Sequence, residues 1–225
     1  MNIGFDEGKV IKKGEDLQSL VKQSFGLMLS MTCIIAIVCI FYSQNLMETL
    51  YHIQENESLA DYNNRIYESS RILQILMGSF VSISITYIFG TLLTANGNLK
   101  QLNLVAVVGV LINLTLNFIF IPIFKSQGAA FTSLCVQFVT CVIQFFIAKS
   151  YFNLKFGFKF WISVVAFVAI LLLTTYILKS TSLQWVYSFV ISLFSGVIIA
   201  FITKVLDFKD LKELIFSSMD QIKKR

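Results

Sequence analysis

Six long apolar stretches without Lys, Arg, Asp or Glu constrain the fold of this 225-residue chain more than any other feature. Crossing about 30 Å of hydrocarbon takes about 20 apolar residues in a helix, and each stretch has about that length. One charged residue at the centre of such a helix would cost roughly 2.5 to 3.5 kcal/mol. We therefore predict six membrane spans, with cores at residues 25–46, 72–94, 102–124, 129–148, 160–178 and 185–203.

The pattern inside these stretches indicates helices. Strands of a membrane barrel alternate polar and apolar residues over about ten positions, whereas residues 34–41 and 164–173 are continuously apolar. Only residues 125–128 separate the third stretch from the fourth, which predicts a tight helical hairpin. The predicted fold class is an all-α integral membrane protein with six transmembrane helices.

The distribution of basic residues predicts the orientation. In a six-span arrangement, fourteen of the eighteen basic residues lie on the side that holds both termini. Because Lys and Arg accumulate in cytoplasmic segments, both termini are predicted to be cytoplasmic. The net charge of +5 needs no nucleic acid partner, since anionic lipid surfaces attract the same residues.

The segments outside the spans suggest surface helices and one external loop. Residues 1–24 are polar and basic, and they predict a short interfacial helix that leads into the first span. Residues 52–71 form the main predicted external loop. Residues 204–225 place apolar side chains at steps of three and four, which predicts an amphipathic tail on the cytoplasmic surface or a helix that docks a partner.

No catalytic, metal or cofactor site is predicted. Chemistry within a membrane uses ionisable residues, and the span cores contain none. His52 is the only histidine, which argues against a metal site that uses histidine. The four cysteines lie inside spans without the close pairing of metal or redox sites, so they are predicted to pack: Cys33, Cys39, Cys135 and Cys141.

Uncharged polar residues inside the spans are the remaining candidates for a binding site. In the second span Ser79, Ser82, Thr86 and Gly90 share one face, which indicates either close helix packing or the wall of a substrate cavity.

Amides mark the next two spans. Asn113 and Asn117 share a face of the third span, and Gln137 and Gln144 share a face of the fourth. Their hydrogen bonds to one another would contribute about 0.6 kcal/mol each, so both cavity lining and structural bonding stay open. The candidate substrate-cavity residues are therefore Asn113, Asn117, Gln137, Gln144, Ser82 and Thr86.

Three segments, Gly90–Asn98, Asn113–Pro122 and Gly128–Thr132, carry a family resemblance. A leucine-rich run, the "NLTLNFIFIP" span and the "GAAFT" start of the next helix together resemble the C-terminal region of polysaccharide flippases. These flippases share a superfamily with lipid II flippases and with multidrug and toxic compound extrusion antiporters. The sequence departs from the family pattern at residues 123–127 and at Phe131.

This resemblance implies a fold and a function. Flippases of this family have about twelve to fourteen spans in two halves, so the chain corresponds to about half of that fold. The implied activity is flipping of lipid-linked oligosaccharide repeat units across the bacterial inner membrane for cell-surface polysaccharide biosynthesis. The resemblance further implies that this chain is a truncated or split part of a flippase, or that a second chain supplies the remaining helices. Its other implied partners are membrane lipids and the lipid-linked oligosaccharide itself.

Two alternatives stay open. A drug or cation antiporter of the same superfamily would need an ionisable cavity residue for coupling, and the spans contain none. A membrane scaffold for polysaccharide assembly, which transports nothing itself, would recruit glycosyltransferases through the amphipathic tail.

Overall fold

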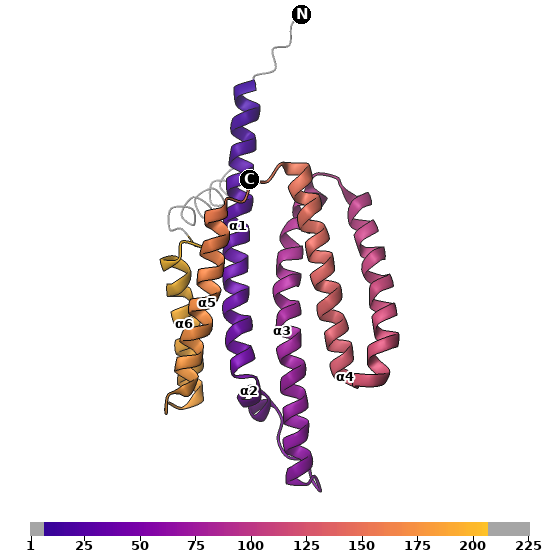
Figure 1. Cartoon of the computed structure of the whole chain (residues 1–225), viewed down its shortest axis with the longest axis vertical. Helices are drawn as coiled ribbons and strands as arrows, with labels where there is room; N and C mark the ends of the chain where they lie inside the picture. Colours follow the sequence, from indigo (N-terminus) through magenta and orange to yellow (C-terminus); the bar gives the residue numbers. More distant parts are fainter. Residues whose placement is uncertain (1–6, 207–225) are drawn as a thin grey trace, which may run out of the picture.

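The computed structural model describes the backbone of residues 7–206 and the side chains of residues 17–206. This part of the chain contains helices and no strands, which confirms the predicted all-α class. Figure 1 shows the long helices side by side along one axis. In chain order the helices are α1 (Glu7–Phe41), α2 (Ser43–Leu50), α3 (Leu59–Ala95), α4 (Leu99–Phe152), α5 (Phe158–Ser180) and α6 (Trp185–Ile202).

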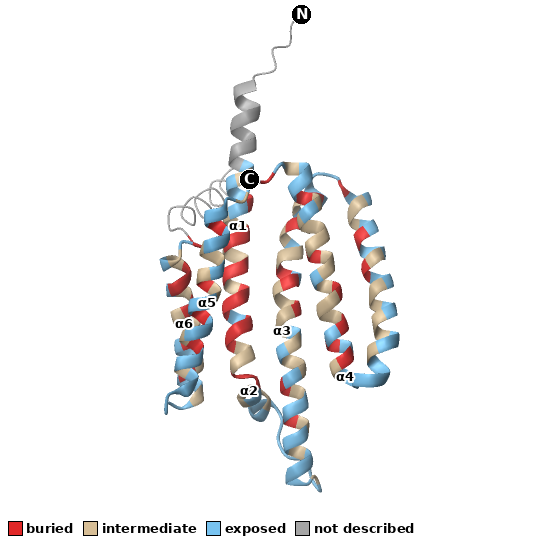
Figure 2. Cartoon of the chain, in the orientation of Figure 1, coloured by how far each residue is buried: buried red, intermediate tan, exposed pale blue. Residues whose placement is uncertain are grey.

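Five of the described helices, all except α2, are long and apolar enough to cross a membrane. Figure 2 shows exposed positions along α4, α5 and α6, and many of the exposed side chains on these helices are large and apolar. Phe118 is 80% exposed and Phe194 is 70% exposed, and many other large apolar side chains are also exposed. Apolar surface on this scale is stable against lipid tails and unstable in water.

Helix α4 has 54 residues and folds back on itself at Lys125, where φ is 49° and ψ is −127°. Figure 1 shows its two arms side by side, and we call residues 99–124 the first arm and residues 126–152 the second arm. The turn lies within the predicted hairpin region. Gly128 lets the arms approach there, because a Cβ on it would meet the backbone oxygen of Phe120.

The first helix ends earlier than the predicted span. It stops at Phe41, and Ser43 already begins α2, whereas the predicted span runs to residue 46. At this end a distant side chain satisfies the helix carbonyl, because Lys179 Nζ donates a hydrogen bond of 2.6 Å to the Phe41 carbonyl oxygen. A cation at the end of a helix satisfies a carbonyl that would otherwise lack a partner.

The stretch predicted as the external loop is largely helical, because α3 begins at Leu59. Ser58 caps this helix, since its hydroxyl oxygen accepts a 3.2 Å hydrogen bond from the Asp61 backbone N–H. At the other end of the chain, the predicted amphipathic tail lies outside the described residues, apart from its first three.

The helices pack as two groups that share the α1–α3 contact. Helices α5 and α6 pack on one another and on α1, while both arms of α4 lie on the α3 side (Figure 1). An aromatic cluster joins the groups near one end of the bundle. At its centre, the ring of Phe25 lies 5.5 Å from that of Phe89, 5.4 Å from that of Phe156 and 5.9 Å from that of Phe160.

Candidate functional site

A groove of about 350 Å³ lies between α3 and the two arms of α4, and we call it the amide groove because three amide side chains are among its lining residues. It contains four of the six predicted cavity residues, which come from three separate helical segments. None of its lining residues is charged: Thr86, Val105, Ala106, Gly109, Val110, Asn113, Leu114, Val136, Gln137, Thr140 and Gln144.

Two small or compact residues bring the arms together at this groove. A Cβ on Gly109 would lie 3.1 Å from Cγ2 of Thr140, so a larger residue on the first arm would push the second arm away. The Thr140 hydroxyl is already satisfied within its own helix, because it donates to the carbonyl oxygens of Val136 and Gln137 at 2.9 and 3.1 Å. Thr140 therefore shapes the groove and leaves the binding of polar groups to the amides.

The amides differ in how far their hydrogen-bonding groups are used. Asn117 Nδ2 donates to Asn113 Oδ1 at 2.9 Å, within the first arm. By contrast, Asn117 Oδ1 and Gln144 Oε1 are buried with no hydrogen-bond partner among the described residues. A buried acceptor without a partner costs about 1 to 3 kcal/mol, which a ligand hydroxyl or amide N–H would recover. Gln144 lines the amide groove and Asn117 does not, so only the Gln144 oxygen is placed to accept a hydrogen bond from an uncharged polar ligand there.

The small-residue face of α3 divides into two parts. Thr86 lines the amide groove, whereas Ser82 does not, and the Ser82 hydroxyl donates to the Gly78 carbonyl oxygen at 3.4 Å. A Cβ on Gly78 would lie 3.0 Å from Cδ1 of Leu134 on the second arm. This part of α3 therefore makes close helix contact, while the part around Thr86 borders the groove.

Sequence reasoning missed Thr140 as a groove residue. Its signal was available, because Thr140 lies three residues after Gln137 and four before Gln144, on the same helical face. The hydroxyl was overlooked because threonine within a membrane helix commonly bonds its own backbone, as this one does.

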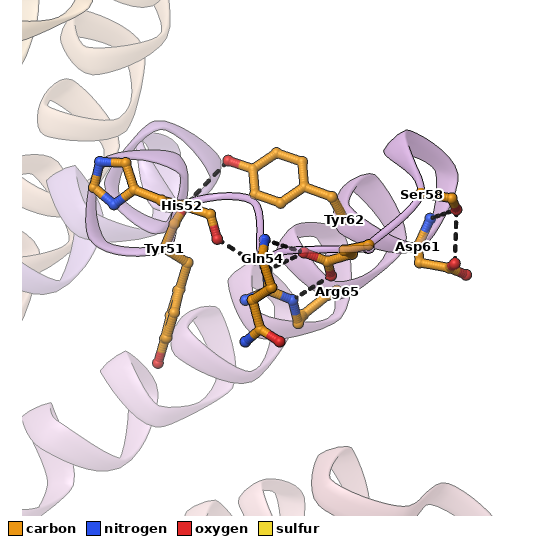
Figure 3. A network of polar contacts seen from close by, with 8 residues as sticks. Tyr51, His52, Gln54, Ser58, Asp61, Tyr62 and Arg65 are labelled. Atoms are coloured by element: carbon orange, nitrogen blue, oxygen red, sulfur yellow. Dashed lines mark hydrogen bonds and ion pairs between the residues drawn. The ribbon is translucent and has the colours of Figure 1, made fainter.

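Charged side chains form a network far from the groove, at the turn between α2 and α3 (Figure 3). Arg65 donates to both carboxylate oxygens of Glu57, at 2.9 and 2.7 Å, and to the His52 carbonyl oxygen at 3.2 Å. The Arg65 side chain lowers the pKa of Glu57, helped by the Gln54 backbone N–H. The same carboxylate raises the pKa of Arg65.

This network has a structural role. The Arg65 guanidinium also lies 5.5 Å from the ring centroid of Tyr62 and 5.8 Å from that of Tyr51. It thus fastens the turn to the first part of α3. Among residues 17–206, no three His, Cys, Asp or Glu side chains gather where they could hold a metal ion.

The helices and the groove define the class of this molecule: an all-helical membrane protein with an uncharged, partly amide-lined groove between its helices. No protein-family model matches the chain, and no curated protein matches it.

Proposed function

We propose that this chain is part of a transporter that flips lipid-linked oligosaccharide repeat units across the bacterial inner membrane. The amide groove carries this proposal, because amides from both arms of α4 meet Thr86 in one uncharged polar space. Sugar hydroxyls both donate and accept hydrogen bonds, and an amide offers both functions. The resemblance of residues 90–132 to polysaccharide flippases supports the same assignment.

In this proposal the chain crosses the membrane six times, with α4 crossing twice and both ends in the cytoplasm. The charge distribution supports this orientation. Among the basic residues with described side chains, six lie in segments predicted to be cytoplasmic (Lys22, Lys100, Lys149, Lys155, Lys159 and Lys204) and four lie in segments predicted to be external (Arg65, Arg71, Lys125 and Lys179).

The mechanism in this proposal is alternating access, in which a polar cavity opens first to one side and then to the other. The amide groove forms part of one wall and binds the saccharide, while the apolar surfaces of α4 accommodate the lipid. The groove has no charge to neutralise the phosphates of a lipid-linked sugar. We assign that task to a second polypeptide that faces the groove.

Alanine at Asn113, Asn117, Gln137 and Gln144 together tests the proposal. We expect flipping to slow about tenfold or more, since each lost hydrogen bond contributes about 0.5 to 1.5 kcal/mol. The measurement uses inverted membrane vesicles from the producing cells, which retain any partner chain. A fluorescent lipid-linked oligosaccharide in the outer leaflet becomes protected from dithionite when it is flipped.

The matched control is Asn103→Ala, because Asn103 is an exposed amide of the first arm outside the groove. This variant should flip the probe at the wild-type rate, and vesicles from cells without the gene should not flip it. A wild-type rate in the fourfold alanine variant would contradict the proposed role of the groove.

A further inference from the structure

A second polar cavity, of about 320 Å³, lies where α1, α5 and the end of α6 meet. It shares no lining residue with the amide groove, and Figure 1 shows α5 and α6 on the opposite side of α1 from α4. Three lysines from three different elements converge on it. We call it the lysine cavity, and its lining residues are Lys22, Gln23, Lys159, Phe160, Ser163, Lys204 and Val205.

No carboxylate is among the described residues that line the lysine cavity. The sequence contains no Asp or Glu between Glu68 and Asp207. Where side chains are described, every carboxylate lies between Glu48 and Glu68, at the far end of the bundle. The ion pair of this region joins Arg65 to Glu57. Three lysines that line one cavity attract an anion.

The backbone adds to this positive potential. Helix α5 begins at Phe158, and no side chain caps it at Gly157. Its first N–H groups therefore carry the partial positive charge of a helix N-terminus, which favours phosphate and other anions. Lys159 and Phe160, from this first turn, line the cavity.

Close contacts hold the three elements in place. After α6 the chain turns through Lys204, whose φ of 56° is left-handed. The next residue, Val205, lies against α1, where a Cβ on Gly26 would be only 2.8 Å from the Val205 carbonyl oxygen. On the other side, Lys22 Nζ lies 5.8 Å from the centroid of the Phe160 ring. The lysines thus belong to a packed junction.

We propose that the lysine cavity binds the phosphate of an anionic phospholipid headgroup. Phe160 and Val205 add apolar lining to the three lysines, which suits a molecule with a charged head and apolar tails. The neighbouring Phe158 and Trp161 are exposed, as aromatic residues at headgroup depth commonly are. Basic pockets between membrane helices bind anionic headgroups in this way, and this inference is independent of the proposed transport activity.

The test compares two triple variants of the full chain in dodecyl maltoside by native mass spectrometry. One variant is K22Q/K159Q/K204Q, in the lysine cavity. The other, K100Q/K149Q/K155Q, removes the same charge from the same end of the bundle outside the cavity. Each is titrated with dioleoylphosphatidylglycerol and with dioleoylphosphatidylcholine, and the phosphatidylglycerol complex is then challenged with inorganic phosphate.

We expect one tightly bound phosphatidylglycerol on the wild-type protein. The cavity variant should bind it on the order of 100-fold more weakly, at roughly fivefold for each lysine, while the control variant stays within about twofold. The triple Lys→Arg variant should retain binding, because it keeps the charge. If the triple glutamine variant fails to fold, Lys22→Gln and Lys159→Gln alone should each show the fivefold loss.

Three results would overturn the proposal. Equal losses in both triple variants would indicate general attraction to the basic surface. Equal binding of phosphatidylcholine would show that headgroup charge does not matter. Displacement of the lipid by millimolar inorganic phosphate would assign the cavity to a soluble phosphate compound.

Discussion

Replacing Gly128 with alanine is expected to destabilise the folded protein by about 3 kcal/mol, the upper part of the range for overpacked positions. The added Cβ would meet the carbonyl oxygen of Phe120 and would lie 2.7 Å from its carbonyl carbon and 3.2 Å from the Ile121 nitrogen. These are backbone atoms, so no side-chain rotation can relieve the overlap. The turn at Lys125 would have to open, and the amides of the two arms would separate.

Gly157→Ala is the matched control for this change. No atom lies within 4 Å of the Cβ position at Gly157, and its φ of −65° suits alanine. Unfolding by sodium dodecyl sulfate in dodecyl maltoside micelles, followed by circular dichroism, measures both variants. The Gly157→Ala variant should unfold at the same dodecyl sulfate fraction as the wild-type protein. The Gly128→Ala variant should unfold at a lower fraction. If both unfold together, the arms of α4 do not pack as described.

Phe25→Ala is expected to cost about 3 kcal/mol, the lower end for removal of a buried phenylalanine. Phe25 is 3% exposed, and its ring contacts those of Phe89, Phe156 and Phe160. In a membrane the cost comes mainly from lost van der Waals contact, because lipid tails are as apolar as the protein interior. The variant loosens α1 from α3 and from the start of α5 together.

The matched control is Phe118→Ala, which removes a phenyl ring at a position on the first arm of α4 that is 80% exposed. It should change stability by less than about 0.5 kcal/mol in the same detergent titration. Equal losses for Phe25→Ala and Phe118→Ala would show that the aromatic cluster does not hold the helices together.

The positions of the helices were largely predictable because a charge-free apolar stretch is a local property of the sequence. The helix ends were less predictable, since they depend on distant partners. The end of α1 at Phe41 involves Lys179, which is 138 residues away in sequence. Likewise, α3 extends to Leu59 through charged residues that no hydropathy pattern assigns to a membrane helix.

In the candidate sites, too, the local relations were predictable from the sequence and the relations between helices were not. Helical spacing predicted that Asn113 and Asn117 share one helix face and that Gln137 and Gln144 share another. Each pair lies within one helical segment, so the spacing alone fixes its shared face. Which helix faces meet is a tertiary property, and so Thr86 but not Ser82 lines the amide groove.

The lysine cavity gave no signal in the sequence. Lys22, Lys159 and Lys204 are far apart in the chain, and only the packing of α1, α5 and α6 brings them to one cavity.

Cysteine labelling in spheroplasts tests most directly the central claim, that the chain crosses the membrane six times with α4 crossing twice. The four native cysteines are replaced with alanine, and single cysteines are placed at His52, Lys100, Lys125 and Lys155. We predict that a membrane-impermeant maleimide labels positions 52 and 125 in intact spheroplasts, and positions 100 and 155 only after lysis. Labelling of position 125 on the same side as position 100 would contradict the claim, because the first arm of α4 would then not cross the membrane.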